Sequence, residues 1–208
     1  MDDPRTGRIL ALGSQAAPTL AAMTSIAIAW HSGYGHTRKL AEAVSAGAGS
    51  VPGVRVASID VAAIDAAGWD ALARADAIVF GAPTYMGGPS APFKVFADAT
   101  ATIWLTQGWR DKVAGGFTCS LAMSGDKAST LAYFVTLAMQ HGMVWVGLGL
   151  LQASEPGAPD AVNRIGSYTG VMAQADNVPP DESPPQGDLD TAYAYGQRIA
   201  TITGRLRG

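Results

Sequence analysis

The stretch Ile26–Thr37 reads IAIAWHSGYGHT and joins an apolar run to a glycine-containing turn and the start of a helix. Its first part, Ile26–Trp30, is short, continuous and apolar, which is typical of a buried parallel strand. From Thr37 to Gly47 the apolar residues recur at helical spacing. A strand that turns directly into a helix N-terminus offers an anion free backbone N–H groups and the positive end of the helix dipole. The stretch therefore predicts a phosphate-binding turn.

The spacing within this turn indicates which kind of phosphate it holds. Arg38 stands where the dinucleotide fingerprint G-x-G-x-x-G requires its third glycine, and the pattern G-x-x-x-x-G-K-[ST] is absent. The turn is instead rich in hydroxyl groups, from Ser32, Tyr34 and Thr37. Amides and hydroxyls without an obligatory cation suit a single phosphate monoester, such as that of FMN. An ordinary strand-to-helix turn that uses glycine for its geometry is the alternative that the turn alone leaves open.

The composition indicates one compact domain, with or without a tail. The 208 residues are 48% hydrophobic and only 15% charged, against about 25% charged residues in typical domains. This low charge density, together with 25 glycines, favours large buried faces, including faces between subunits. The net charge of −3 and the lack of any Lys/Arg run argue against a nucleic-acid partner.

Cysteine and histidine usage argues against a disulfide and against a metal centre. Cys119 is the only cysteine, so an intrachain disulfide and a cysteine-rich metal site are excluded. His31, His36 and His141 lack the spacing of metal ligands. No apolar segment reaches the roughly 20 residues that span a membrane, so we expect a cytoplasmic protein without a membrane span.

Two segments fall outside the regular pattern. Residues 1–23 resemble a signal peptide only loosely, because Asp2 and Asp3 oppose a basic start and Gly13 interrupts the apolar run. We expect this segment to be an extension outside the fold or the result of an overcalled start codon, and residues 24–208 to form the domain. The stretch 152–187 is long and proline-rich. Its composition does not distinguish between three interpretations, which are a lid, a partner-contact segment and a disordered loop.

Apolar strands alternate with helical stretches along the rest of the chain. We expect strands at 26–30, 54–59, 77–81, 113–118 and 143–146, and helices at 37–47, within 62–73, and at 91–101, 127–140 and 189–205. Strands joined by crossover helices form a parallel sheet with right-handed connections and helices on both faces. Five such strands predict a doubly wound α/β sheet of order 2-1-3-4-5. Ligands then bind at the carboxyl ends of the strands, where the loops 31–37, 82–88 and 118–125 converge.

Four groups of residues carry a resemblance to a known family. They are Ser32–Thr37 (SGYGHT), Gly81–Gly87 (GAPTYMG), His141–Met143 (HGM), and Phe96–Trp104, which fits F-x-D-x-T-x-x-x-W. Through them the chain resembles the flavodoxin-like superfamily, and within it the WrbA-type NAD(P)H:quinone oxidoreductases, first named tryptophan-repressor-binding proteins. The resemblance implies bound FMN, NAD(P)H as co-substrate, a quinone-like substrate, and a homotetramer or homodimer with shared active sites.

The resemblance also implies roles for individual residues. The first loop would hold the FMN phosphate, the second would flank the isoalloxazine ring, and the third would wrap the ring's polar edge. His141 would be the catalytic residue, Tyr34 would meet the nicotinamide nucleotide, and Trp104 would border the substrate pocket. The expected cofactor-binding residues are Ser32, Gly33, Tyr34, Gly35, His36, Thr37, Pro83, Thr84, Tyr85, Met86, Gly87, Ser120, Leu121, Ser124 and Gly125.

These roles have structural alternatives. His141 follows a helix whose C-terminus would stabilise a cationic histidine. The alternative is therefore that His141 only caps this helix and takes no part in catalysis. Tyr85 and Met86 also suit a core, and Trp104 also suits a subunit interface. The third loop, SLAMSG at 120–125, departs from the glycine-rich loop of the family, which changes how closely backbone N–H groups approach the ring.

The sequence therefore predicts an FMN-dependent NAD(P)H:quinone oxidoreductase. FMN would accept a hydride at N5 from NAD(P)H, and a quinone would then take two electrons together in a ping-pong reaction, so no residue needs to be a nucleophile. One alternative is a flavodoxin-type electron carrier without a substrate of its own. Such carriers are usually acidic, and the net charge of −3 gives that alternative weak support. Another is an interaction protein that kept the fold and lost the flavin.

Overall fold

The computed structural model describes residues 23–155 and 158–208, so the predicted extension lies outside the described residues except for Met23. The elements in chain order are β1 (Thr24–Trp30), α1 (His36–Gly49), β2 (Val54–Asp60), η1 (Val61–Ala63), α2 (Ala66–Arg74), β3 (Ala77–Tyr85), β4 (Gly88–Pro89), α3 (Ala91–Ala99), α4 (Ala101–Leu105), β5 (Val113–Ser120), α5 (Lys127–Gln140), β6 (Val144–Trp145), β7 (Val171–Gln174) and α6 (Gln186–Arg207).

A parallel sheet forms the middle layer of the molecule, in the order β2-β1-β3-β5-β6. β1 pairs with β2 on one side and with β3 on the other, and β3 pairs with β5. With the short hairpin strand β4 left out of the count, this is the order 2-1-3-4-5. The predicted doubly wound α/β sheet is therefore confirmed, with its switch point between β1 and β3.

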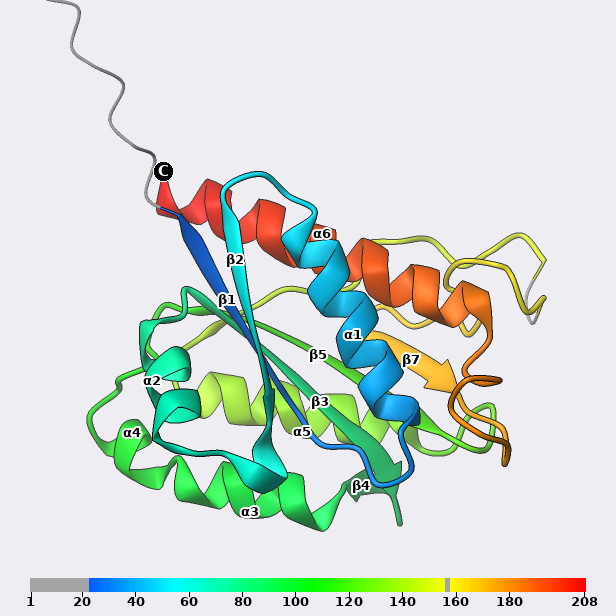
Figure 1. The fold of residues 1–208 in the computed structure, drawn as a ribbon, viewed down its shortest axis with the longest axis horizontal. Helices are drawn as coiled ribbons and strands as arrows, with labels where there is room; N and C mark the ends of the chain where they lie inside the picture. Colours follow the sequence, from blue (N-terminus) through cyan, green and yellow to red (C-terminus); the bar gives the residue numbers. More distant parts are fainter. Residues whose placement is uncertain (1–22, 156–157) are drawn as a thin grey trace, which may run out of the picture.

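Helices cover both faces of the sheet (Figure 1), and each face has its own core. Successive residues of a strand point to opposite sides. Ile26 and Ile28 of β1 therefore pack into the core beneath α1 and α6, whereas Ala27 and Ala29 pack into the core beneath α3 and α5. The second core is aromatic, and the rings of Phe80, Phe93, Phe96, Trp109 and Phe134 contact one another within it.

β3 is longer than predicted because it continues into a hairpin. The predicted end at Gly81 is wrong, and the strand runs to Tyr85 before β4 returns beside it in antiparallel pairing. Met86 and Gly87 form the two-residue turn, with φ values of 49° and 80°. Such a turn needs positive φ at both positions, which suits the twist of paired strands. The second predicted loop is therefore mostly a rigid hairpin.

The edge strand consists of two pieces, of which only the first was predicted. β6 pairs with the beginning of β5, and β7 pairs with its end, from Phe117 to Ser120. The proline-rich stretch 152–187 therefore contains a strand, and the residues after β7 leave the sheet at its carboxyl edge. Two helix boundaries also differ, since 91–101 is divided into α3 and α4, and α6 begins at Gln186 rather than Leu189.

Across residues 23–155 and 158–208, no helix has the length and apolar character needed to cross a bilayer. The predicted cytoplasmic location is not decided by that finding and stays a prediction.

Candidate functional site

The N-terminus of α1 is built to receive an anion. Gly35 precedes the helix with a φ of 95°, a left-handed conformation that favours glycine. Its N–H donates to Ser32 Oγ at 3.0 Å, which closes the turn. The first N–H groups of a helix have no intrahelical acceptor, and the first turn of α1 contains no acidic residue. These N–H groups can therefore bind phosphate oxygens, as predicted for this turn.

A cavity of about 540 Å³ opens beside this helix end. We call it the first cavity. Its walls come from the loop before α1, from the ends of β3 and β5, and from the residues after β7. Its volume lies within the range of roughly 300–1,000 Å³ that is usual for ligand sites. The predicted cofactor-binding residues that line it are Ser32, Tyr34, His36, Thr37, Pro83, Tyr85, Ser120 and Leu121.

One wall of the first cavity is a segment that sequence reasoning missed, Ala175–Asp181, of which Ala175–Pro180 line the cavity. We call it the 175–181 segment. His36 donates through Nε2–H to the carbonyl oxygen of Val178 at 2.9 Å, and Lys39 forms an ion pair with Asp181 at 2.6 Å. Both contacts hold the segment against the N-terminal turn of α1. Its prolines indicated only a loop, because no local motif shows which distant helix a loop will contact.

Buried hydroxyl groups lie behind the cavity wall. Thr84 Oγ1 is 2.8 Å from both Thr118 Oγ1 and Thr130 Oγ1, so the Thr84 side chain is engaged inside the protein. Thr37 Oγ1 lies 3.1 Å from Cys119 Sγ. Burial raises the pKa of the Cys119 thiol to about 11. The thiol is therefore neutral at pH 7 and unreactive as a nucleophile.

Aromatic side chains stand at the mouth of the cavity. Tyr34 is 78% exposed, and its ring meets that of Tyr85 edge-on with 6.3 Å between centroids. Met86, in the turn after β3, is fully exposed and so is not a core residue. Burial, with smaller contributions from Cys119 and Tyr34, raises the pKa of Tyr85, so the Tyr85 phenol stays protonated near neutrality. Exposed rings beside a cavity present a surface on which a flat molecule can stack.

A second cavity, of about 450 Å³, lies on the flank formed by α3, α4 and α5. Trp104, 48% exposed, and His141, 1% exposed, both line it. The structure thus brings the predicted substrate-binding tryptophan and the predicted catalytic histidine together. It does not bring them to the first cavity, because the two cavities share no lining residue within one chain.

The hydrogen bonds of His141 define its tautomer. Thr100 Oγ1 donates to the carbonyl oxygen of Ala97 at 2.7 Å, so it accepts from His141 Nε2–H at 2.9 Å. Nδ1 is then an acceptor, and no described residue donates to it. Burial lowers the pKa of His141, and the ring packs on Trp109 with 4.5 Å between centroids. His141 is the C-cap of α5, but a neutral ring brings no positive charge to the helix dipole.

The remaining predicted residues shape the loops without lining the first cavity. They are Gly33, Gly35, Thr84, Met86, Gly87, Ser124 and Gly125. A Cβ at Gly33 would strike the Tyr85 hydroxyl, and one at Gly125 would strike Ser120, so both positions allow close approach of neighbouring loops. Their direct contact with a cofactor stays a prediction. Within the described ranges, no group of three or more His, Cys, Asp or Glu side chains is arranged to hold a metal ion.

Comparisons with known proteins identify the family. The chain is 41% identical over 186 residues to flavodoxin FldP of Pseudomonas aeruginosa, covering 88% of this chain and 99% of that protein. A solved structure described as the flavodoxin, WrbA-like protein from Agrobacterium tumefaciens matches with a TM-score of 0.70 and 43% identity, covering 88% of this chain and 98% of that one. The chain belongs to the WrbA-like family of flavodoxin-fold proteins.

A further relative and a domain model agree with this assignment. An NAD(P)H dehydrogenase (quinone) of Geobacter sulfurreducens is 33% identical over 207 residues, covering 88% of this chain and all of that protein. The family model described as NADPH-dependent FMN reductase matches residues 66–155. The predicted flavodoxin-like fold and FMN as cofactor are thereby confirmed, and NAD(P)H as co-substrate fits the same relatives.

The first cavity of this WrbA-like protein fits FMN. The phosphate would bind to the N–H groups and hydroxyls of Ser32–Thr37, where no carboxylate opposes it in the first turn of α1. A Cβ at Gly35 would lie 2.8 Å from a ring carbon of Pro180, so only glycine leaves this cradle open. Tyr85 and Ser120, at the carboxyl ends of the neighbouring strands β3 and β5, line the same cavity and would flank the rest of the cofactor.

Proposed function

We propose that this WrbA-like protein is an FMN-dependent NAD(P)H:quinone oxidoreductase. When bound, FMN would supply the chemistry of both half-reactions, hydride uptake from NAD(P)H and two-electron transfer to a quinone. The observation that carries the proposal is the open mouth of the first cavity, where Tyr34 and Tyr85 present exposed rings to a flat molecule. Relatives named NAD(P)H dehydrogenase (quinone), at 33% and 29% identity, support it.

The residues of the first cavity bind and orient, and none is required as a nucleophile. Ser32–Thr37 hold the phosphate, and Tyr34 contacts the nicotinamide nucleotide at the mouth. Cys119 takes no part, because its buried thiol is neutral. The proton for the quinone comes from His141, from Tyr34 or from water.

The substrate pocket is completed by a second copy of the chain, in a homotetramer or homodimer. Trp104 and His141 lie away from the first cavity of their own chain, so they can serve a flavin only from a neighbouring subunit. Their flank also carries exposed apolar side chains, among them Val95, Leu105 and Met139. In this arrangement Trp104 forms a wall against the quinone.

Steady-state oxidation of NAD(P)H with benzoquinone, in the absence of any other protein, tests the reaction. We expect sustained turnover by the purified, yellow protein, with parallel lines in double-reciprocal plots as for a ping-pong reaction. Light scattering at micromolar concentration tests the assembly. A fully active monomer would contradict the shared pocket but would not contradict the proposed NAD(P)H:quinone oxidoreductase reaction.

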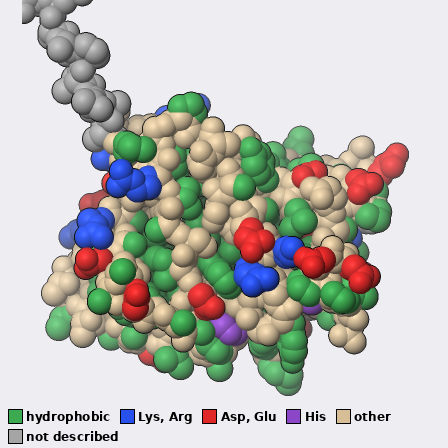
Figure 2. Space-filling view, in the orientation of Figure 1, with side chains coloured by type: hydrophobic (Ala, Val, Ile, Leu, Met, Phe, Trp, Pro, Cys, Tyr) green, Lys and Arg blue, Asp and Glu red, His purple; other side chains and the backbone are tan. Residues whose placement is uncertain are grey.

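A flavodoxin-type electron carrier is the second candidate. The relative at 41% identity is named a flavodoxin. Exposed carboxylates also lie beside the first cavity, at Asp176, Asp181 and Glu182, and acidic side chains are more frequent than basic ones at the right-hand end of Figure 2. Such a surface suits docking to a basic partner. A carrier would show no NAD(P)H oxidation with benzoquinone until a separate reductase was added, whereas an oxidoreductase needs none.

A further inference from the structure

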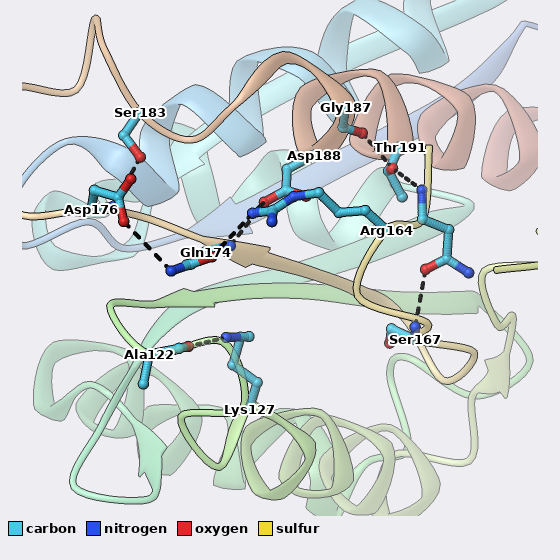
Figure 3. Close-up of polar contacts among 11 residues, drawn as sticks. Ala122, Lys127, Arg164, Ser167, Gln174, Asp176, Ser183, Gly187, Asp188 and Thr191 are labelled. Atoms are coloured by element: carbon cyan, nitrogen blue, oxygen red, sulfur yellow. Dashed lines mark hydrogen bonds and ion pairs between the residues drawn. The ribbon is translucent and has the colours of Figure 1, made fainter. Parts of the chain in front are cut away.

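Lys127 is a fully buried cation at the start of α5, with 0% of its surface exposed. Its Nζ donates to Ser120 Oγ at 2.9 Å. It also donates to the carbonyl oxygen of Ala122 at 2.8 Å (Figure 3). Ser120 Oγ in turn donates to the same carbonyl oxygen at 3.1 Å. The ammonium group therefore ties together the first residues of the loop 120–126 from inside the protein.

The charge of Lys127 is not neutralised by its neighbours. Asp188 accepts two hydrogen bonds from Arg164, at 2.8 and 3.0 Å, and one from the N–H of Gln174 at 2.9 Å, so its carboxylate is committed elsewhere (Figure 3). The Cys119 thiol is neutral at pH 7. Asp188 favours the Lys127 ammonium through space and Arg164 offsets that effect in part, so Lys127, Arg164 and Asp188 together carry one net positive charge.

The protonation of Lys127 is compatible with this role. Burial lowers its pKa to about 8, with a smaller lowering from Arg164, while Cys119 and Asp188 act in the opposite direction. The group therefore carries its proton at pH 7. A buried charge is screened much less by salt and water than an exposed one, so it acts over a longer distance.

This charge lies one hydrogen bond behind the wall of the first cavity. Ser120, which accepts from Lys127, lines the cavity, and so does Leu121 next to it. The loop has a single glycine, Gly125, and side chains at its other positions limit how closely its backbone N–H groups can approach a ligand. A side-chain cation held behind Ser120 would add positive potential at this wall without such close approach.

We propose that Lys127 is a positioning residue for FMN, which holds Ser120 at the cavity wall and places a positive charge behind it, so that the protein binds reduced FMN in preference to oxidised FMN. The proposal rests on FMN occupying the first cavity and does not depend on the quinone as substrate. Two-electron reduction at neutral pH adds two electrons and one proton to the ring, so the reduced cofactor carries one more negative charge. A nearby buried cation stabilises that charge.

The test is the affinity of the apoprotein for both redox forms of FMN, with dithionite as reductant and no NAD(P)H or quinone present. Lys127→Met removes the charge and keeps the apolar stem. We expect the ratio of reduced to oxidised affinity to fall at least tenfold, which lowers the two-electron midpoint potential by about 30 mV. Lys127→Gln removes the charge but keeps an N–H donor for the loop, and we expect the same direction of change.

Lys112 offers a matched control. Lys112 is partly buried, burial lowers its pKa as it lowers that of Lys127, and its Nζ donates to two backbone carbonyls, those of Ala73 and Ala75. Lys112 directly precedes β5, whereas Ser120 ends that strand, so at about 3.3 Å per residue the two residues lie roughly 26 Å apart. Lys112→Met should cost stability and leave the affinity ratio unchanged.

Three outcomes would overturn the proposal. The first is an unchanged potential in both Lys127 variants. The second is equal weakening of oxidised and reduced FMN, which would make Lys127 a structural residue only. The third is the same shift in Lys112→Met. A wild-type apoprotein that bound neither form would instead contradict the FMN site, and a normal potential without quinone turnover would contradict only the proposed reaction.

Discussion

The two cavities of this chain are built in different ways. The first lies at the carboxyl edge of the sheet, where a helix N-terminus, two strand ends and the 175–181 segment supply backbone groups, hydroxyls and a buried cation. The second lies between helices and combines a buried neutral histidine with an exposed tryptophan. The first is complete enough within one chain to bind a cofactor. The second contains the two residues that we propose serve the quinone, and in a single chain it shares no lining residue with the first cavity.

Gly35→Val should produce the largest effect, and it acts on the first cavity. The substitution places a β-branched residue at a φ of 95° and drives it against Pro180. We expect FMN affinity to fall at least tenfold, about 1.4 kcal/mol, when apoprotein is titrated with FMN. Gly53→Val is the control, because Gly53 has a φ of 77° with no atom within 4 Å of an added Cβ. It should cost stability without weakening FMN, and an equal loss in both variants would contradict the assignment.

The first cavity could be predicted from sequence to the extent that its parts are local. Ser32–Thr37 follow a buried strand and open a helix, so spacing alone indicated a phosphate site. The extent of β3 could not be predicted in the same way. Pro83 reads as the start of a loop, yet the turn at Met86 and Gly87 brings β4 back to pair with the strand. The pairing of β3 with β4 extends the strand to Tyr85, although the local propensity of Pro83 favours a loop.

The second cavity carries the clearest pH dependence. Burial lowers the pKa of His141, so the unfolded chain binds a proton below about pH 6.5 that the folded chain resists. Stability is therefore lost as the pH falls through this range, by at most about 1.4 kcal/mol per pH unit. Thermal unfolding between pH 7.5 and 5 measures the slope. His141→Gln should reduce the slope without abolishing it, because burial lowers the pKa of His31 too. An unchanged slope would show that His141 accepts protons freely in the folded state.

Trp104→Ala should change the kinetics with quinone, which we assign to the second cavity, without changing FMN binding in the first cavity. Offset stacking of a quinone on an aromatic ring contributes about 0.5–1.5 kcal/mol beyond buried area, so we expect kcat/KM for the quinone to fall roughly two- to tenfold. FMN affinity should stay at the wild-type value, because Trp104 does not line the first cavity. Leu105→Ala is the control, since Leu105 is an exposed neighbour that does not line the second cavity. A loss of stability with no selective change in quinone kinetics would make Trp104 a packing residue.

The 175–181 segment shows why part of the site was beyond sequence reasoning. Its place depends on β7, four residues that pair with β5 only after a long excursion from β6. It depends also on contacts between partners far apart in the chain, such as His36 with Val178. Loop closure of this kind leaves no local periodicity. Lys127 was missed for a related reason, because a lysine at a helix start usually faces solvent, and only the fold of loop 120–126 buries it.

Lys39→Ala should produce the smallest effect, because the ion pair with Asp181 is exposed on the Asp181 side. Exposed pairs contribute little and are screened by salt. If the pair helps to hold the 175–181 segment over the phosphate turn, FMN should dissociate about twofold faster at low ionic strength, and the difference should vanish in high salt. Arg38→Ala is the control, since Arg38 forms its ion pair with Glu42 along α1 and affects the pKa of Asp181 less than Lys39 does. Stopped-flow release of FMN into a competing apoflavodoxin measures both. A Lys39 effect that persists in high salt would mean that the lysine contacts the phosphate itself, which would make the first cavity cationic at both ends.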